Sequence, residues 1–315
     1  MRHLLTLEDW TPEQITEAVT LARTLKANPN PYADALRRKT LCMIFQKPSL
    51  RTRLSFEAGM NQMGGHAIYY DTSTSPFGAG KESIADTVRT MCRYVDIIMA
   101  RIFKHEDLLE MARYSTVPII NALTNFSHPG QILADLQTIA EHKGRLAGLK
   151  LAYLGDSFNN VTHSLLFACP KMGLHLSIGC PAGKEYEPAS SALAAAQTDA
   201  AKNGVRFEVT HDAATAVRDA DVVYTDSWMS YHIPKDKAGE RMEIFGPYQV
   251  TAPLMKQAKP GAIFLNCLPA MRGLEQTAEV IDGPQSVVFD QAENRMHMHK
   301  ALMLLLLREA GTIQG

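Results

Sequence analysis

Short β-type apolar runs alternate with longer helical stretches along the chain, and this alternation leaves few possible folds. In the first half, strands are expected at residues 40–46, 67–71, 96–101 and 117–121. The helices between them are expected at residues 51–63, 82–94 and 104–114. Alternating strands and helices imply right-handed crossovers, which produce parallel sheets covered by helices. The pattern therefore predicts an α/β fold class.

A second series of the same kind follows a long helix that is expected at residues 128–143. Its strands are expected at residues 149–155, 174–179, 205–210, 221–225 and 262–266. Its helices are expected at residues 161–172, 188–203 and 295–310. A single hydrophobic core stops growing near about 250–300 residues, so this chain suits two domains. We expect each domain to be a parallel sheet flanked by helices, with inter-domain helices joining the two.

The expected domain boundary lies within the long helix between the two series. The first domain comprises residues 1–135, with a C-terminal helix at about 295–315 that packs back on it. The second domain comprises residues 136–294.

Composition and charge exclude several classes of protein. The formal net charge is −1 and Lys and Arg form no run longer than three residues, so nucleic acid is not an expected partner. No apolar run approaches the roughly 20 residues that cross a bilayer, and the first ten residues lack a signal-peptide core, so we expect no membrane association and a cytoplasmic location. The cysteines include no CxxC pair, which argues against a disulfide framework or a structural zinc site.

Two connections are long and polar, at residues 72–81 and 226–248. Loops longer than about 12–15 residues in compact domains tend to be functional or disordered. We expect both to be active-site loops, and the alternative is a simple surface insertion.

The strongest local signal is the segment SLRTR at residues 49–53, where an expected strand ends and a helix begins. The N–H groups at a helix start carry partial positive charge and bind anions. Ser49 and Thr52 add hydroxyl donors, and Arg51 can form a charge-assisted fork with phosphate oxygens. Because α/β sheets bind ligands at the carboxyl ends of their strands, the segment predicts a phosphate site. An ordinary capped helix with two solvated arginines is the alternative.

Two further features indicate the same ligand. Arg101 closes an expected strand, where it could clamp a phosphate or polarise a carbonyl unless it is a surface salt-bridge residue. His128 and Gln131 open the long helix. The imidazole can donate to a developing oxyanion and the amide can bind an amide nitrogen. A His that precedes a Pro is otherwise a cap or a loop residue.

Six segments, in order along nearly the whole chain, resemble signatures of the aspartate/ornithine carbamoyltransferase family. SLRTR at 49–53 is similar to the Ser-Thr-Arg-Thr-Arg signature of both branches, and HPGQ at 128–131 is similar to their His-Pro-x-Gln signature. The segments that resemble the ornithine branch are GDSFNNV at 155–161, DSWMS at 226–230, NCLPA at 266–270 and FDQAENR at 289–295.

The resemblance implies a two-domain transferase of arginine biosynthesis. Such an enzyme moves the carbamoyl group of carbamoyl phosphate onto the δ-amine of L-ornithine, giving L-citrulline and phosphate. The resemblance further implies a homotrimer that uses no metal and no cofactor. Residues 1–135 would bind carbamoyl phosphate, and residues 136–294 would bind ornithine.

The roles of the family's residues carry over by position. The residues implied to bind carbamoyl phosphate are Ser49, Leu50, Arg51, Thr52, Arg101, His128, Gln131, Cys267, Leu268 and Arg295. The residues implied to bind ornithine are Asn160, Asp226, Ser230 and Tyr231. Those implied to act in catalysis are Arg101, His128, Cys267 and Asp226. We expect direct attack by the neutral amine, without an acyl-enzyme on the cysteine.

Several positions depart from the family pattern. Leu50 stands where the signature has Thr, and its backbone N–H can still serve there. Gly130 stands where Cys or Thr is usual, and Asn266 replaces a common His. Phe77 stands roughly where many members carry a Gln that reaches carbamoyl phosphate.

The largest departure concerns the loop that grips the amine, where Ser230-Tyr231-His232 replaces the usual Ser-Met-Gly. This leaves open transfer to another amine, such as putrescine or an acylated ornithine. The catabolic direction and a non-catalytic ligand-binding relative also stay open. Aspartate is disfavoured as acceptor because Asp226 would repel its carboxylates. A nucleotide-binding dehydrogenase is disfavoured because no GxGxxG follows the expected strand at 149–155.

Overall fold

The computed structural model describes residues 3–78, 80–229 and 233–314. The chain divides into two compact units, one made of Met1–Gln137 with Glu293–Gly315 and one made of Thr138–Ala292. Each unit contains a parallel sheet flanked by helices, so the predicted fold class is confirmed. None of the helices in the described ranges has both the length and the hydropathy that a bilayer crossing needs.

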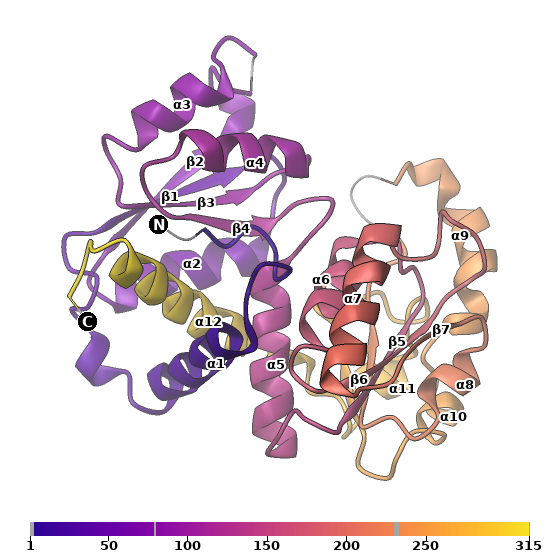
Figure 1. The fold of residues 1–315 in the computed structure, drawn as a ribbon. Coiled ribbons are helices and arrows are strands. Elements are labelled where there is room, and N and C mark those ends of the chain that lie inside the picture. Colours follow the sequence, from indigo (N-terminus) through magenta and orange to yellow (C-terminus); the bar gives the residue numbers. More distant parts are fainter. Residues whose placement is uncertain (1–2, 79, 230–232, 315) are drawn as a thin grey trace. The chain divides into compact units, whose positions relative to one another are not determined.

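The sheet of the first unit has the order β2-β1-β3-β4, and each neighbouring pair is parallel. Its strands are β1 (Thr40–Phe45), β2 (His66–Asp71), β3 (Ile97–Arg101) and β4 (Ile119–Leu123). Its helices are α1 (Pro12–Ala27), η1 (Asn30–Tyr32), α2 (Leu50–Gln62), η2 (Thr72–Thr74), α3 (Ile84–Met91) and α4 (His105–Tyr114), with parts of α5 (Pro129–Lys143) and α12 (Val288–Glu309). Figure 1 shows α3 and α4 on one face of this sheet and α2 on the other. One core cluster joins apolar side chains of β1, β3, α3 and α4.

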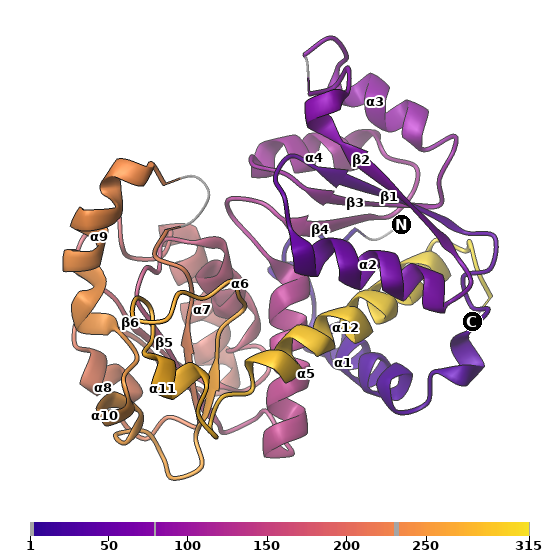
Figure 2. The same ribbon diagram turned by 180° about the vertical axis from the view of Figure 1, so that it is seen from behind.

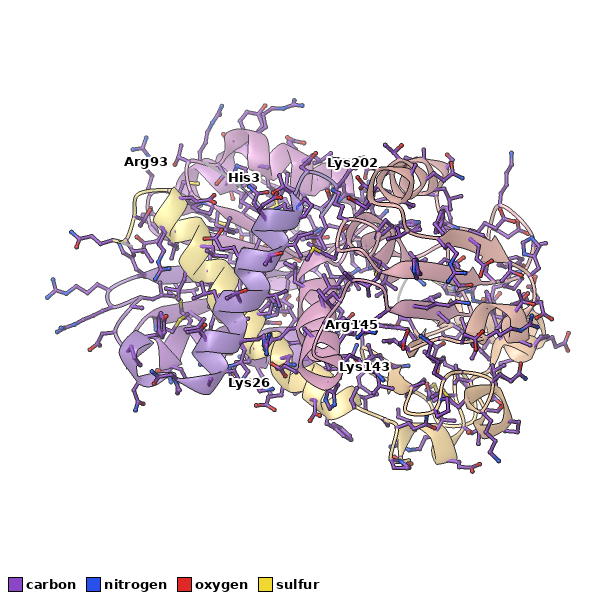
Figure 3. All side chains as sticks on the ribbon, turned by 60° about the horizontal axis from the view of Figure 1, so that its bottom comes forward. His3, Lys26, Arg93, Lys143, Arg145 and Lys202 are labelled. Atoms are coloured by element: carbon purple, nitrogen blue, oxygen red, sulfur yellow. The ribbon has the colours of Figure 1, made fainter. Side chains whose placement is uncertain are left out.

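Helix α12 packs among the other helices of the first unit. It lies beside α1 and α2 in both ribbon views (Figures 1 and 2). Lys26, which Figure 3 labels, lies in the last turn of α1. Its Nζ donates to Asn294 Oδ1 on α12 at 2.8 Å. Most of α12 between residues 298 and 307 is fully buried, so this helix is part of the core of the unit.

The sheet of the second unit has the order β7-β6-β5-β8-β9, again with parallel pairs. Its strands are β5 (Lys150–Leu154), β6 (His175–Gly179), β7 (Phe207–Thr210), β8 (Val222–Thr225) and β9 (Ile263–Leu265). Its helices are α6 (Asn160–Ala168), α7 (Ser190–Asn203), α8 (Ala213–Val217), η3 (Lys235–Lys237), α9 (Ala238–Phe245), η4 (Gly246–Tyr248), α10 (Ala252–Met255) and α11 (Ala278–Ile281). A core cluster joins apolar side chains of β5, β8 and β9 to α8, α10 and α11.

Each sheet contains one point at which the chain reverses the direction in which it adds strands. In the first unit this point lies between β1 and β3, and in the second it lies between β5 and β8. The connections that leave such neighbouring strands go to opposite faces of the sheet, which leaves a crevice at the carboxyl ends. The topology therefore predicts one ligand position in each unit.

Two expected elements differ from the structure. The segment 226–248 is not a plain loop, because it contains η3, α9 and η4. Helix α9 buries only Phe245, so its sequence carries no apolar periodicity. The last helix begins at Val288 rather than near residue 295, because its first turns bury the polar residues Gln291 and Asn294. Gln and Asn are usually exposed, so a sequence does not indicate that these two amides are buried and belong to the helix.

The first prediction concerns Asn159, the N-cap of α6. Its Oδ1 accepts from Thr162 N at 2.9 Å, and its Nδ2 donates to Tyr153 Oη at 2.9 Å. Both contacts are buried, so we expect Asn159→Ala to lower the free energy of unfolding by about 1–3 kcal/mol. The measurement is thermal or urea unfolding. The matched control is Asp212→Ala, which removes the exposed cap of the short helix α8. A loss for Asp212→Ala as large as that for Asn159→Ala would contradict the prediction.

Candidate active site

The first candidate half-site lies where β1 and β3 end. Phe45 pairs with Arg101 at the carboxyl ends of these strands. The loop after β1 is fixed by two hydrogen bonds: Gln46 N donates to Arg101 O at 2.9 Å, and Phe103 N donates to Gln46 Oε1 at 2.8 Å. The segment that leads into α2 is therefore held next to Arg101.

Helix α2 begins at this edge with its N-terminus capped by Ser49. Thr52 N donates to Ser49 Oγ at 3.3 Å, which leaves the serine hydroxyl proton available for an anion. The Leu50 side chain is 69% exposed, so only its backbone N–H can serve the site. Arg51 is partly buried on the same first turn. The first N–H groups of a helix have no acceptor within the helix, so this turn favours an anionic ligand.

Positive charge is concentrated around this turn. Arg101, Lys47 and Arg295 are all buried. Burial, and then the charge of Arg101, lower the pKa of Lys47 to about 7. Burial, followed by Arg295 and Arg101, lowers the pKa of His128 well below its usual range, so this imidazole is neutral. A neutral imidazole can donate one hydrogen bond to an oxyanion, while the surrounding cations favour a multiply charged anion.

Arg295 connects two of the expected ligand contacts. Its Nη2 donates to Thr52 Oγ1 at 3.2 Å and its Nη1 donates to Gln131 Oε1. Gln131 Nε2 in turn donates to Asp135 Oδ1 at 2.8 Å. The amide of Gln131 is thereby oriented, and its carbonyl oxygen keeps a second lone pair for an amide N–H of a ligand.

The second candidate half-site lies where β5 and β8 end. Asp226 follows β8 and is buried, and Cys267 Sγ donates to its Oδ1 at 3.1 Å. Asn160 begins α6 and is partly buried. Leu268 N donates to Asn266 Oδ1 at 2.8 Å, so the backbone of Leu268 offers its carbonyl rather than its N–H to a ligand.

Negative charge is concentrated around this second half-site. Asp156, Asp226 and Glu275 are all buried. Burial raises the pKa of Asp156 to about 6 against the opposing effect of Arg241, and Asp226 raises it further. Burial also raises the pKa of Glu275, and Asp226 contributes in the same direction. Arg241 pairs with Asp156. The cluster favours a cationic ligand.

A glycine allows the two strand ends to approach each other here. Gly155 directly follows β5 with φ 114°, and a Cβ at this position would lie 2.7 Å from Trp228 Nε1. The Trp228 backbone is held from both sides, because its N–H donates to Glu275 Oε1 at 3.3 Å and its carbonyl accepts from Arg241 Nε at 2.6 Å. The segment after Asp226 is therefore fixed by the same acidic cluster.

The structure thus groups the expected residues by unit. The first unit brings together Ser49, Leu50, Arg51, Thr52, Arg101, His128, Gln131 and Arg295. The second unit contains Asn160, Asp226, Cys267 and Leu268. Ser230 and Tyr231 lie outside the described residues.

Several charged residues of these half-sites escaped the sequence reasoning. Lys47 could have been predicted as part of the anion site, because it stands two residues before the serine that caps α2. Asp156 had one as well, because it follows Gly155 at a strand end. Arg241 and Glu275 lie outside all six segments that resemble family signatures, so no local sequence pattern indicates their role.

Comparisons with known proteins agree with this geometry. The family model described as "Aspartate/ornithine carbamoyltransferase, carbamoyl-P binding domain" matches residues 2–141, and the model described as "Aspartate/ornithine carbamoyltransferase, Asp/Orn binding domain" matches residues 147–306. The ornithine carbamoyltransferase of Thermococcus kodakarensis is 49% identical over 311 residues, which cover 97% of this chain and 96% of the relative.

The chain belongs to the aspartate/ornithine carbamoyltransferase family.

Solved structures of family members have the same fold. The ornithine carbamoyltransferase of Pyrococcus furiosus superposes with a TM-score of 0.92 at 48% identity, covering 97% of this chain and 96% of that one. The anabolic ornithine carbamoyltransferase of Campylobacter jejuni superposes with a TM-score of 0.91 at 36% identity, covering 98% of this chain and 100% of that one. The fold of this family member is therefore shared over nearly all of the chain.

The second prediction concerns the charge of Lys47. In the ligand-free protein its pKa is lowered to about 7, and a bound dianion raises it again. Above that pH, binding must take up a proton, so affinity falls as pH rises by up to about tenfold per unit. Sulfate is a suitable probe because it stays doubly charged across this range. We expect its affinity, measured by calorimetry, to fall between about pH 7 and about pH 9.

The matched control for this prediction is Lys47→Arg. Arginine stays protonated throughout this range, so the pH dependence of sulfate affinity should flatten. His128 does not contribute, because its pKa lies well below the range. A flat profile in the unmodified protein would contradict the assignment of Lys47 to the anion site.

Proposed function

We propose that this protein transfers the carbamoyl group of carbamoyl phosphate to the δ-amine of L-ornithine, giving L-citrulline and phosphate in arginine biosynthesis. The observation that carries the proposal is the opposite charge of the two half-sites. Buried cations surround a helix start in the first unit, and buried carboxylates surround the strand ends in the second. The first suits an acyl phosphate dianion and the second suits a diamino acid.

The first unit supplies the binding groups for carbamoyl phosphate. Ser49, Arg51, Arg101 and the first N–H groups of α2 hold the phosphate in this proposal, and Lys47 adds a further cation. The residues proposed around the carbamoyl group are Thr52, Arg101, His128, Gln131 and Arg295. The family resemblance also leads us to propose that Cys267 and the Leu268 carbonyl serve the carbamoyl nitrogen.

Reaction proceeds by direct attack of the amine on the carbonyl carbon. A tetrahedral oxyanion forms and is stabilised by Thr52, Arg101 and His128, which are donors placed where the charge develops. The carbon–oxygen bond to phosphate then breaks, the leaving phosphate oxygen takes the extra proton of the attacking nitrogen, and HPO4²⁻ leaves with its charge already matched by the start of α2. The neutral state of His128 suits it to donate a hydrogen bond rather than to transfer a proton.

The amine must lose a proton before it attacks. If its pKa resembles that of lysine, near 10.4, keeping it neutral at about pH 7.4 costs roughly 4 kcal/mol. Asp226 and Cys267 are the groups that we propose to accept or relay this proton. The thiol donates to Asp226, which favours a protonated sulfur over a thiolate nucleophile. No acyl-enzyme is therefore proposed.

The amino-acid end of ornithine is proposed to contact Asn160, Asp226, Ser230 and Tyr231. For Ser230 the support is the resemblance of DSWMS to the family segment, and Tyr231 is proposed from its place directly after that segment, where it departs from the family pattern. The acidic cluster disfavours aspartate as the acceptor, since two more carboxylates would add to its repulsion.

We further propose a homotrimer that resides in the cytoplasm and needs neither metal nor cofactor. The family resemblance supports the trimer. No disulfide joins any of the five cysteines, all of which lie in the described ranges, and this suits a reducing compartment. Among the described residues, no three His, Cys, Asp or Glu side chains are grouped as metal ligands.

The third prediction tests the phosphate site with Arg51→Met. Charged hydrogen bonds are each worth about 1.5–3 kcal/mol, so we expect the KM for carbamoyl phosphate to rise at least about tenfold. The matched control is Arg53→Met on the same helix. Arg53 pairs with Glu57 at 3.1 Å and stacks over the Tyr69 ring at 4.1 Å, so its loss should change the KM less than about threefold. Equal effects of both substitutions would remove Arg51 from the site.

The fourth prediction tests the acceptor. Citrulline-type product formation is measured with ornithine, putrescine, acetylornithine and aspartate at saturating carbamoyl phosphate. We expect ornithine to give a kcat/KM at least about tenfold above the other amines, because it alone pairs an α-ammonium with the carboxylates while presenting the δ-amine.

The variant Asp226→Asn provides the control for the acceptor screen. We expect it to reduce kcat/KM for ornithine at least about tenfold while the KM for carbamoyl phosphate changes little. Higher activity with putrescine or acetylornithine than with ornithine would replace the proposed acceptor. Absence of product with all four amines would point to a non-catalytic relative.

A further inference from the structure

Helix α12 carries a buried histidine that neither the motifs nor the mechanism account for. His299 is 1% exposed and stands one turn after Arg295. Residues four apart in a helix lie on one face, so both side chains point to the same region of the first unit. Figure 2 shows α12 beside α2, whose first turn forms the anion site.

His299 is attached to α2 by two contacts. Its Nδ1 lies 2.8 Å from Ser55 Oγ, and Ser55 Oγ donates to Thr52 O at 3.2 Å. Its ring also stacks on Phe56, with centroids 3.8 Å apart and an interplanar angle of 13°. Since Ser55 lies one turn after Thr52, the histidine holds the turn that carries the phosphate donors.

The hydroxyl of Ser55 defines which ring nitrogen carries the proton. A hydroxyl has one proton, and Ser55 gives it to the Thr52 carbonyl. The tautomer that satisfies both contacts of Ser55 therefore has its proton on His299 Nδ1 and a lone pair on Nε2. Burial, and then the charge of Arg295, lower the pKa of His299 well below its usual range, so the ring adds no charge to the anion site.

The other edge of the ring faces the start of α5. A Cβ at Gly130 would lie 3.1 Å from His299 Nε2, which is tighter than ordinary van der Waals contact. Gly130 stands between His128 and Gln131, at the start of α5. Its missing side chain thus provides the space that the histidine ring needs.

We propose that His299 is a positioning residue for the carbamoyl phosphate half-site. By bonding to Ser55 and filling the space at Gly130, it sets the first turn of α2 against the first turn of α5. These turns present Thr52 and Gln131, the two residues that Arg295 joins. The proposal rests on the proposed function for its substrate, and on the geometry of one unit for its mechanism.

The fifth prediction compares His299→Leu with His299→Asn. Leucine removes the donor to Ser55, and we expect the KM for carbamoyl phosphate to rise about five- to tenfold while the KM for ornithine changes less than about twofold. Asparagine places an amide N–H near the position of Nδ1, so it should recover most of the loss. Ser55→Ala removes the same hydrogen bond from the other side and should reproduce the effect without changing the size of the core.

The space at Gly130 gives a second test that a merely structural role would not pass. Gly130→Ala alone should raise the KM for carbamoyl phosphate, because its Cβ presses on Nε2. Asparagine at 299 lacks that atom, so Gly130→Ala should have little additional effect in the His299→Asn background. This expected non-additivity is the signature of direct contact.

Calorimetry with inorganic phosphate separates this inference from the proposed function. If His299→Leu weakens phosphate binding while the unmodified protein forms no citrulline, the positioning role stands and the proposed function fails. If phosphate affinity and both KM values are unchanged in His299→Leu and Ser55→Ala, while only the melting temperature falls, His299 serves packing alone and the inference is overturned. Additive effects of Gly130→Ala and His299→Asn would also overturn it.

Discussion

Several buried cations lie close together at the start of α2 and repel one another, and the structure of the first unit must hold them there despite this repulsion. Lys47, Arg101 and Arg295 come from a loop, a strand end and a helix that are far apart in sequence. Contacts within the protein fix the backbone beside Lys47 and Arg101 and the side chain of Arg295. The loop after β1 is bonded to the Arg101 backbone, and Arg295 is braced by Thr52 and Gln131. A preorganised site of this kind needs little rearrangement when the dianion enters, which is the property that makes electrostatic catalysis effective.

The two units place their candidate half-sites at the same position of the sheet, but the buried charges at these positions have opposite signs. Each sheet reverses its direction of growth once, and each candidate half-site sits at the strand ends beside that reversal. Backbone topology therefore sets where a ligand binds, whereas the side chains at the strand ends set which ligand binds. Arg101 closes β3 in one unit, while Asp226 follows β8 in the other. Two copies of one architecture can thereby select an acyl phosphate and a diamino acid.

Sequence reasoning succeeded where the signal was local. Strand ends, the helix start after Ser49 and the start of α5 are properties of short segments, and the fold class followed from the alternation of strands and helices. It missed groups whose role arises only from packing. Ser55 and His299 are separated by 244 residues, and helix α9 is nearly without buried apolar residues. Arg241 reaches Asp156 from that helix, so no periodicity or motif could place it.

The same charges that suit the ligands work against the stability of the empty protein. Lys47 has a pKa lowered to about 7, so its charge costs stability fully below that pH, and the cost is relieved as pH rises toward the unfolded value. Asp156 has a pKa raised to about 6, so its charge costs stability fully above that pH, and the cost is relieved as pH falls. Between about pH 6 and about pH 7 both costs are present together, and this is also the range in which both half-sites carry the charge that their substrates require. The buried charges that the substrates require lower the stability of the protein without substrate. A bound substrate of opposite charge offsets this cost, so each substrate should stabilise the unit that binds it.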